Sequence, residues 1–224
     1  MKKHVLIICF SFFINSLFSQ ENKQELVWFD NIIHQKNLPI DQGIIYAEKY
    51  RTFNRNHHFL FDNAFLKGNL KYNNQMYYNV SMKYDTYDDN LILKINSKTE
   101  IFSIILNKEL TSFFQINGRT FYNINSSGFY EILYKSKNET LVKKHFSKKE
   151  TLEKEFVYSN FTHEEKLFIF KDNKFHTMSN EKDFHEIFPT KKKVITDFFE
   201  MNKRKNIEDN AGFILNLIKK LNNE

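Results

Sequence analysis

Apolar and polar residues alternate through the middle of the chain with a period of two, which is typical of half-buried β-strands. The pattern is clearest in 66–72 and 76–84, which the turn-forming pair Asn73-Asn74 separates. Asn117-Gly118 predicts a second tight hairpin, because this pair readily adopts positive φ angles. Further strands are expected at 91–95, 101–106, 113–116, 120–124, 129–134, 141–146, 155–158, 166–170 and 174–178. About ten short strands at this spacing predict an antiparallel meander.

After residue 180 the apolar positions follow helical spacing instead. A short helix is expected to end at Pro189, and Thr190 is expected to cap the next helix. The last helix has one apolar face, made by Phe213, Ile214, Leu217, Ile218 and Leu221. The predicted fold is therefore mainly β (α+β): a meander forming a barrel, half-barrel or sandwich, with C-terminal helices. We expect a single domain over 20–224, with its helical part at 181–224, because no repeat or linker interrupts it.

The first residues have the three parts of a secretory signal peptide. Lys2 and Lys3 form a basic start, 5–18 is almost wholly apolar, and Ser19 precedes a polar stretch. We expect a signal peptide over 1–19, since the apolar run is shorter than the roughly 20 residues of a spanning helix. Cys9 is the only cysteine and lies inside this segment, so no thiol chemistry is expected in the mature chain.

Composition and charge narrow the class further. The chain has 224 residues, of which 25 are Phe and 11 are Tyr, and this is too apolar for a disordered protein. The formal charge of +6 is modest for this length, and export disfavours a nucleic-acid partner. Lysines cluster at 135–154, 191–193 and 203–205. They indicate either an acidic partner or, more simply, a solvated face that protects sheet edges.

Two groups of residues resemble metal sites. His57, His58 and Asp62 form the first, but adjacent histidines on a strand point to opposite faces, so two surface histidines are expected. Carboxylates crowd the second, which has the composition of a calcium loop but lacks the glycine and glutamate of an EF-hand. A polar hairpin turn is the simpler interpretation. This second group consists of Asp85, Asp88, Asp89 and Asn90.

No catalytic motif is present. Asp183 and His185 flank Phe184, but a solvated helix start explains them better than an acid–base pair. The chain has no Gly-x-Ser-x-Gly elbow and no glycine-rich phosphate loop, and its 5 glycines are too few for either. We therefore predict no catalytic residues, no metal site and no cofactor.

Several segments resemble a recurring pattern of secreted proteins of Bacteroidota, of the flavobacterial type. The resemblance covers most of residues 50–221, and Ser19-Gln20 is similar to the signal-peptide end common in that phylum. It implies an exported, β-rich protein and supplies no site, because the family has no assigned activity. Within it, Gly68 is expected at a bulge or close approach and Asp85 at a turn. The matching blocks are KGNLKY at 67–72, YYNVSMKYD at 77–85, DNLIL at 89–93, GFYEILY at 128–134, and FP at 188–189 with KKK at 191–193.

These observations predict an exported, non-enzymatic cell-envelope protein that binds an envelope protein or a ligand. Its place would be periplasmic, outer-membrane-associated or extracellular. One alternative is a lipid or hydrophobic-ligand carrier, in which aromatic residues line a half-barrel cavity rather than fill it. A second alternative is a hydrolase whose site is built from distant acids and histidines.

Overall fold

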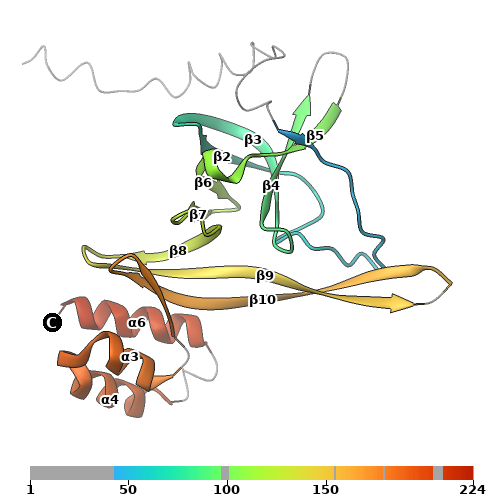
Figure 1. Cartoon of the computed structure of the whole chain (residues 1–224). Helices are drawn as coiled ribbons and strands as arrows, with labels where there is room; N and C mark the ends of the chain where they lie inside the picture. Colours follow the sequence, from blue (N-terminus) through green and yellow to red (C-terminus); the bar gives the residue numbers. More distant parts are fainter. Residues whose placement is uncertain (1–42, 97–100, 154, 179, 204–208, 224) are drawn as a thin grey trace, which may run out of the picture.

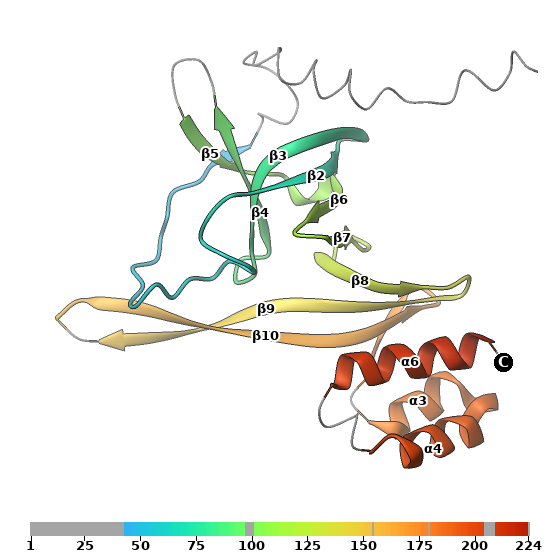
Figure 2. The same ribbon diagram turned by 180° about the vertical axis from the view of Figure 1, so that it is seen from behind.

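The computed structural model describes residues 43–223, except 97–100, 154, 179 and 204–208. Within these residues, eleven antiparallel strands form one open sheet, and helices pack against one end of it (Figures 1 and 2). The predicted fold class is confirmed: the protein is mainly β, with an antiparallel sheet that does not close and helices near the C-terminus. The predicted signal peptide lies outside the described residues.

The strands are β1 (Ile44–Ile45), β2 (Leu66–Tyr72), β3 (Gln75–Asp85), β4 (Asn90–Asn96), β5 (Ile101–Ile105), β6 (Thr111–Ile116), β7 (Arg119–Asn123), β8 (Phe129–Lys135), β9 (Glu139–Glu153), β10 (Val157–Lys171) and β11 (Lys174–Thr177). The helical elements are η3 (Lys108–Leu110), α3 (Glu181–Ile187), η4 (Pro189–Lys191), α4 (Lys192–Met201) and α6 (Asn210–Asn223).

The strand order is β1-β5-β4-β3-β2-β6-β7-β8-β9-β10-β11, so β2 lies in the middle of the sheet. Strands β2 to β5 form one meander and β6 to β11 form another, and the chain crosses from β5 to the far side of β2 through η3. This crossing is the one departure from a simple meander among the described strands after β1. It brings two sequential meanders together edge to edge.

The predicted turns are confirmed by backbone angles. Asn73 and Asn74 have φ values of 45° and 64°, and Asn117 has 49°. Gly68 lies at a break in the β2–β3 register, where a side chain would overlap the carbonyl oxygen of Gln115 in β6. The bulge and the close approach expected at this glycine are therefore both present.

Strands β9 and β10 form a long hairpin, with 15 residues in each strand. The sequence predicted separate short strands here, at 141–146, 155–158 and 166–170. The stretch between them was missed because much of it is exposed and carries charged residues, so it shows no apolar alternation. Figure 1 shows this hairpin extending from the helices at one end to well beyond them at the other.

The interior of the β2–β8 region is filled with aromatic side chains. Tyr72, Tyr84, Phe114, Phe121 and Phe129 are each at most 1% exposed. The rings of Phe114 and Phe121 stack with centroids 4.8 Å apart, and Phe129 meets Phe114 edge-on at 5.1 Å. These aromatics are core residues that pack against one another.

A second core joins the helices to the sheet. The α6 face predicted from the sequence is buried against Leu141 of β9 and Ile169 of β10. Asn180 and Asp183 form a reciprocal capping box at the start of α3. The prediction that Thr190 caps the next helix is wrong, because Thr190 lies within η4 and α4 begins after Lys191 without a side-chain cap.

Candidate functional site

Buried polar residues, with the exposed His163 at their edge, gather where the segment 46–62 crosses the β3–β4 turn and the β9–β10 hairpin. The backbone carbonyl of His58 accepts hydrogen bonds from both the amide and the hydroxyl of Thr86, at 3.0 and 2.8 Å. The Thr86 hydroxyl is also 2.7 Å from Ser147 Oγ, which in turn is 2.9 Å from His163 Nδ1. Three segments far apart in the sequence are thus connected by one hydrogen-bonded chain.

The direction of this chain follows from counting protons. The single hydroxyl proton of Thr86 goes to the His58 carbonyl, so Ser147 must donate to Thr86. Ser147 then has no proton left, and the Nδ1–H of His163 must donate to it. A serine activated as a nucleophile would instead donate its proton to the histidine. In this arrangement Ser147 is a buried structural hydroxyl.

His58 and Asp85 lie next to this chain. His58 is 2% exposed and packs against Phe59 and Phe161, with ring centroids 4.2 and 5.0 Å away. Its Nε2 is 3.6 Å from Asp85 Oδ2. Burial lowers the pKa of His58. Burial also raises the pKa of Asp85 to about 6, although the amides of Tyr87 and Asp88 donate to its carboxylate.

The prediction of two surface histidines is therefore wrong for His58, because rings from distant parts of the chain cover it. His57 is half-buried, and Asp62 is exposed and lies in the turn that leads to Ala64. The three residues do not form a ligand set. In the part of the chain that the structure describes, no group of three or more His, Cys, Asp or Glu side chains could hold a metal ion.

The carboxylates of the β3–β4 turn serve the fold. Asp89 has a φ of 54° and lies between two lysines, 3.0 Å from Lys108 Nζ and 2.9 Å from Lys144 Nζ. It also accepts a hydrogen bond from the Tyr84 hydroxyl at 2.6 Å. Asp88 pairs with Lys49 at 3.1 Å. The polar-turn interpretation is confirmed at these positions, and the cations that neutralise them come from the protein itself.

A second ionic cluster lies on β7 to β9. His145 Nε2 is 2.6 Å from Glu131 Oε2, and both side chains are at most 10% exposed. Arg119 approaches the same carboxylate at 3.4 Å. Burial favours the neutral form of Glu131, but the hydrogen bond from His145 and the charge of Arg119 outweigh it and lower the pKa. Because the carboxylate is held by two basic groups, the cluster fastens β7, β8 and β9 together.

Asp183 and His185, the remaining acid–histidine candidate, do not contact each other as an acid–base pair would. Asp183 belongs to the capping box of α3, as expected for a helix start. The Nε2 atom of His185 instead faces Glu181 at 3.4 Å and the Thr196 hydroxyl at 3.3 Å. These contacts fasten α3 to α4.

Exposed aromatic residues collect at the free end of the long hairpin. We call Arg51, Phe53, Phe156, Val157 and Tyr158 the hairpin-tip patch. Phe53, Phe156 and Val157 are 44%, 47% and 64% exposed. The Arg51 guanidinium lies 4.0 Å from the Phe156 ring centroid and 5.2 Å from that of Tyr158. Sequence reasoning missed this patch, because its two segments are about a hundred positions apart.

Asn56 holds these two segments in register. Its side-chain amide donates to the Phe161 carbonyl at 2.8 Å and accepts from the Phe161 amide at 2.7 Å. The Ser159 amide donates to the Arg51 carbonyl at 2.8 Å. The segment therefore covers the edge of β10 as a further strand would, and a polar side chain satisfies the exposed backbone groups.

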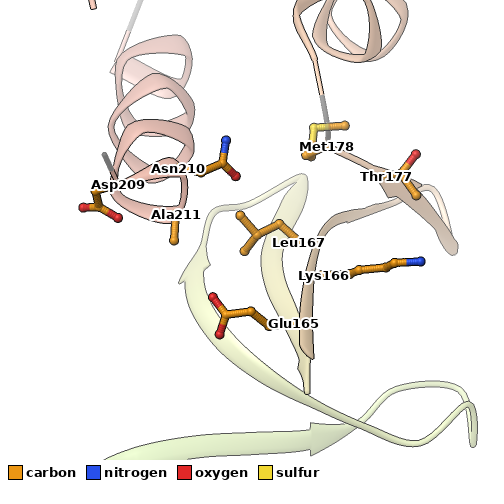
Figure 3. Close-up of a pocket in the computed structure, with 8 residues that line it drawn as sticks. All are labelled: Glu165, Lys166, Leu167, Thr177, Met178, Asp209, Asn210 and Ala211. Carbon is orange, nitrogen blue, oxygen red and sulfur yellow. The ribbon is translucent and has the colours of Figure 1, made fainter. Parts of the chain in front are cut away.

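A hollow lies elsewhere, between β10, the end of β11 and the start of α6 (Figure 3). Leu167 lies between Ala211 and Met178, and Glu165 and Lys166 bring charges to its rim (Figure 3). It is a mixed, open depression that lies apart from the aromatic interior of the sheet. It lacks the apolar lining that a lipid cavity requires.

Comparison with protein-family models, with curated proteins and with solved structures gave no match. None of the helices that the structure describes has the length and apolar character to cross a membrane. The function is therefore inferred from the arrangement of the described residues.

Proposed function

We propose that this chain is an exported, non-enzymatic cell-envelope protein that binds a protein partner through the hairpin-tip patch. The observation that carries the proposal is the cluster of exposed aromatic rings around a stacked arginine at the end of a projecting hairpin. Aromatic residues and arginine are the types most enriched at the energetic centres of protein interfaces. Contiguous exposed apolar patches on proteins often mark interaction sites.

Two further observations favour partner binding over its alternatives. Buried aromatic side chains pack against one another in the interior of the sheet, where a carrier would hold its lipid, and this argues against a carrier. The hydrogen-bond direction at Ser147 and the two-sided neutralisation of Glu131 argue against a hydrolase built on these residues. Export rests on the sequence of the first 19 residues, and cleavage after Ser19 would leave Gln20 as the first residue.

Exposed isoleucines also occur at the β1 edge, at Ile44 and Ile45, and at the start of β5, at Ile101. These positions adjoin residues 1–42 and 97–100, which lie outside the described part of the chain. The hairpin-tip patch combines β10 with the segment 50–56, which hydrogen bonds hold together, so it is the better defined surface.

Site-specific photo-crosslinking tests the proposal. A photoreactive phenylalanine analogue at Phe156 in exported protein should give a discrete crosslinked product in envelope fractions. The matched control carries the analogue at Lys182, whose side chain is 83% exposed on α3 at the other end of the molecule. A product of equal yield from both positions, or from neither, would contradict binding at the patch. Mass spectrometry of the mature N-terminus tests export separately.

A further inference from the structure

We infer that the hairpin-tip patch recognises a protein segment in which one carboxylate lies beside apolar side chains, and that Arg51 binds that carboxylate. The inference rests on the proposed function and adds the chemistry of the partner. The inference is based on the Arg51 side chain, which is charged and exposed and lies over the ring of Phe156.

The Arg51 guanidinium is oriented by aromatic rings rather than by an acid. It lies over Phe156 and near Tyr158, and none of the described carboxylates forms an ion pair with it. The Arg51 guanidinium carbon lies 4.0 Å from the Phe156 ring centroid, and the planar fork of N–H donors on a guanidinium matches the two oxygens of a carboxylate. The exposed rings beside it offer apolar contacts to the groups that flank such a carboxylate.

The backbone beneath the patch is already fixed before a partner arrives. The Arg51 carbonyl is bonded to the Ser159 amide, and Asn56 holds the same segment against Phe161. Because the receptor is preorganised, little conformational entropy has to be lost in the protein on binding.

The charges around the tip select against other anionic partners. Glu150, Glu153 and Glu155 are exposed at this end of the hairpin. Among the neighbouring lysines, Lys148 is paired with Glu164 at 2.6 Å, and Lys149 lies over the Tyr50 ring at 5.2 Å. Among the residues that the structure describes, the tip therefore shows no excess of the positive charge that draws proteins to anionic lipid surfaces. It favours a single carboxylate in an apolar setting over an acidic tract or a bilayer.

The test is selection of displayed random dodecapeptides on the full-length protein, followed by fluorescence anisotropy with synthetic copies of the enriched peptides. Parallel selections use R51Q, which removes the charge, and F156A, which removes the stacked ring. R51K keeps the positive charge but lacks the paired N–H donors of the guanidinium, and K182A serves as the control. All three substituted positions are exposed, so circular dichroism is expected to be unchanged.

We expect wild-type selections to enrich peptides with one Asp, Glu or free C-terminus next to aromatic or aliphatic residues. R51Q should weaken these peptides about tenfold or more, because a charge-assisted bidentate contact is lost, with R51K in between. Enriched peptides that lack an acid and bind R51Q normally but not F156A would overturn the carboxylate inference and leave the proposed function standing. If none of the enriched peptides depends on the patch for binding, both the carboxylate inference and the proposed function are overturned. If wild type binds vesicles of anionic phospholipid and F156A does not, the patch binds a membrane instead of a peptide. That result would also overturn the carboxylate inference.

Discussion

Replacing Asp85 by asparagine (D85N) tests the electrostatics of the buried histidine cluster. Asp85 is 2% exposed, and burial raises its pKa from 3.8 to about 6. Each tenfold change in an ionisation constant corresponds to about 1.4 kcal/mol, so the ionised carboxylate costs about 3 kcal/mol of folding free energy near pH 7. Asparagine resembles the protonated acid, and its side-chain oxygen can still accept from the amides of Tyr87 and Asp88.

The sign follows from proton linkage. A carboxyl group with a raised pKa binds its proton more tightly in the folded protein, so its contribution to stability falls as pH rises from about 4 through 6. We therefore expect D85N to be more stable than wild type at pH 7, by about 1 to 3 kcal/mol. The difference should shrink toward zero at pH 4. The lowered pKa of His58 acts in the opposite direction, because its stabilising effect is lost as the pH falls.

Urea denaturation of both proteins at a series of pH values from 4 to 7.5 measures the difference directly. The matched control is D62N, because Asp62 is exposed and asparagine keeps the bond from the Ala64 amide. We expect D62N to change stability by less than about 0.5 kcal/mol at every pH. A D85N protein that is less stable than wild type at pH 7, or a difference that does not vary with pH, would refute this account of the cluster.

Three other substitutions probe the fold. G68A should cost about 2 to 3 kcal/mol in denaturant unfolding, since the added methyl group meets a backbone carbonyl. N56A removes both bonds to Phe161 and should cost about 1 to 3 kcal/mol, with faster hydrogen exchange at the Phe161 amide. E131Q weakens the bond to His145 and should destabilise the protein by about 1 to 3 kcal/mol at pH 7. Because folding lowers the pKa of Glu131, that loss should disappear as pH falls below about 4, and a pH-independent loss would contradict it.

Local patterns in the sequence predicted most of the fold. The alternation in 66–84, the Asn73-Asn74 turn and the helical spacing after residue 180 all correspond to observed elements. These features depend on near neighbours in the sequence, so one chain is enough to read them. The crossing from β5 to β6 was not predictable in the same way, because it depends on which edge of β2 is free when β6 forms.

The candidate site was harder to predict, because its contacts join distant segments. His58 has the sequence context of a surface residue, and only the approach of Phe161 and the β3–β4 turn makes it buried. Ser147 and His163 lie in a charged stretch without apolar alternation, where a sequence offers no sign of a hydrogen-bonded chain. Exposed phenylalanines at 53 and 156 look like core residues in a sequence.

The bonds between Asn56 and Phe161 span 105 residues of sequence. The segment that carries Arg51 therefore cannot take its place until the chain has been made past Phe161 and the long hairpin has formed. The hairpin-tip patch then comes into existence late in folding, as a product of nearly the whole β-region. A partner that needs both of its segments would ignore nascent or half-folded chains and engage only the finished protein.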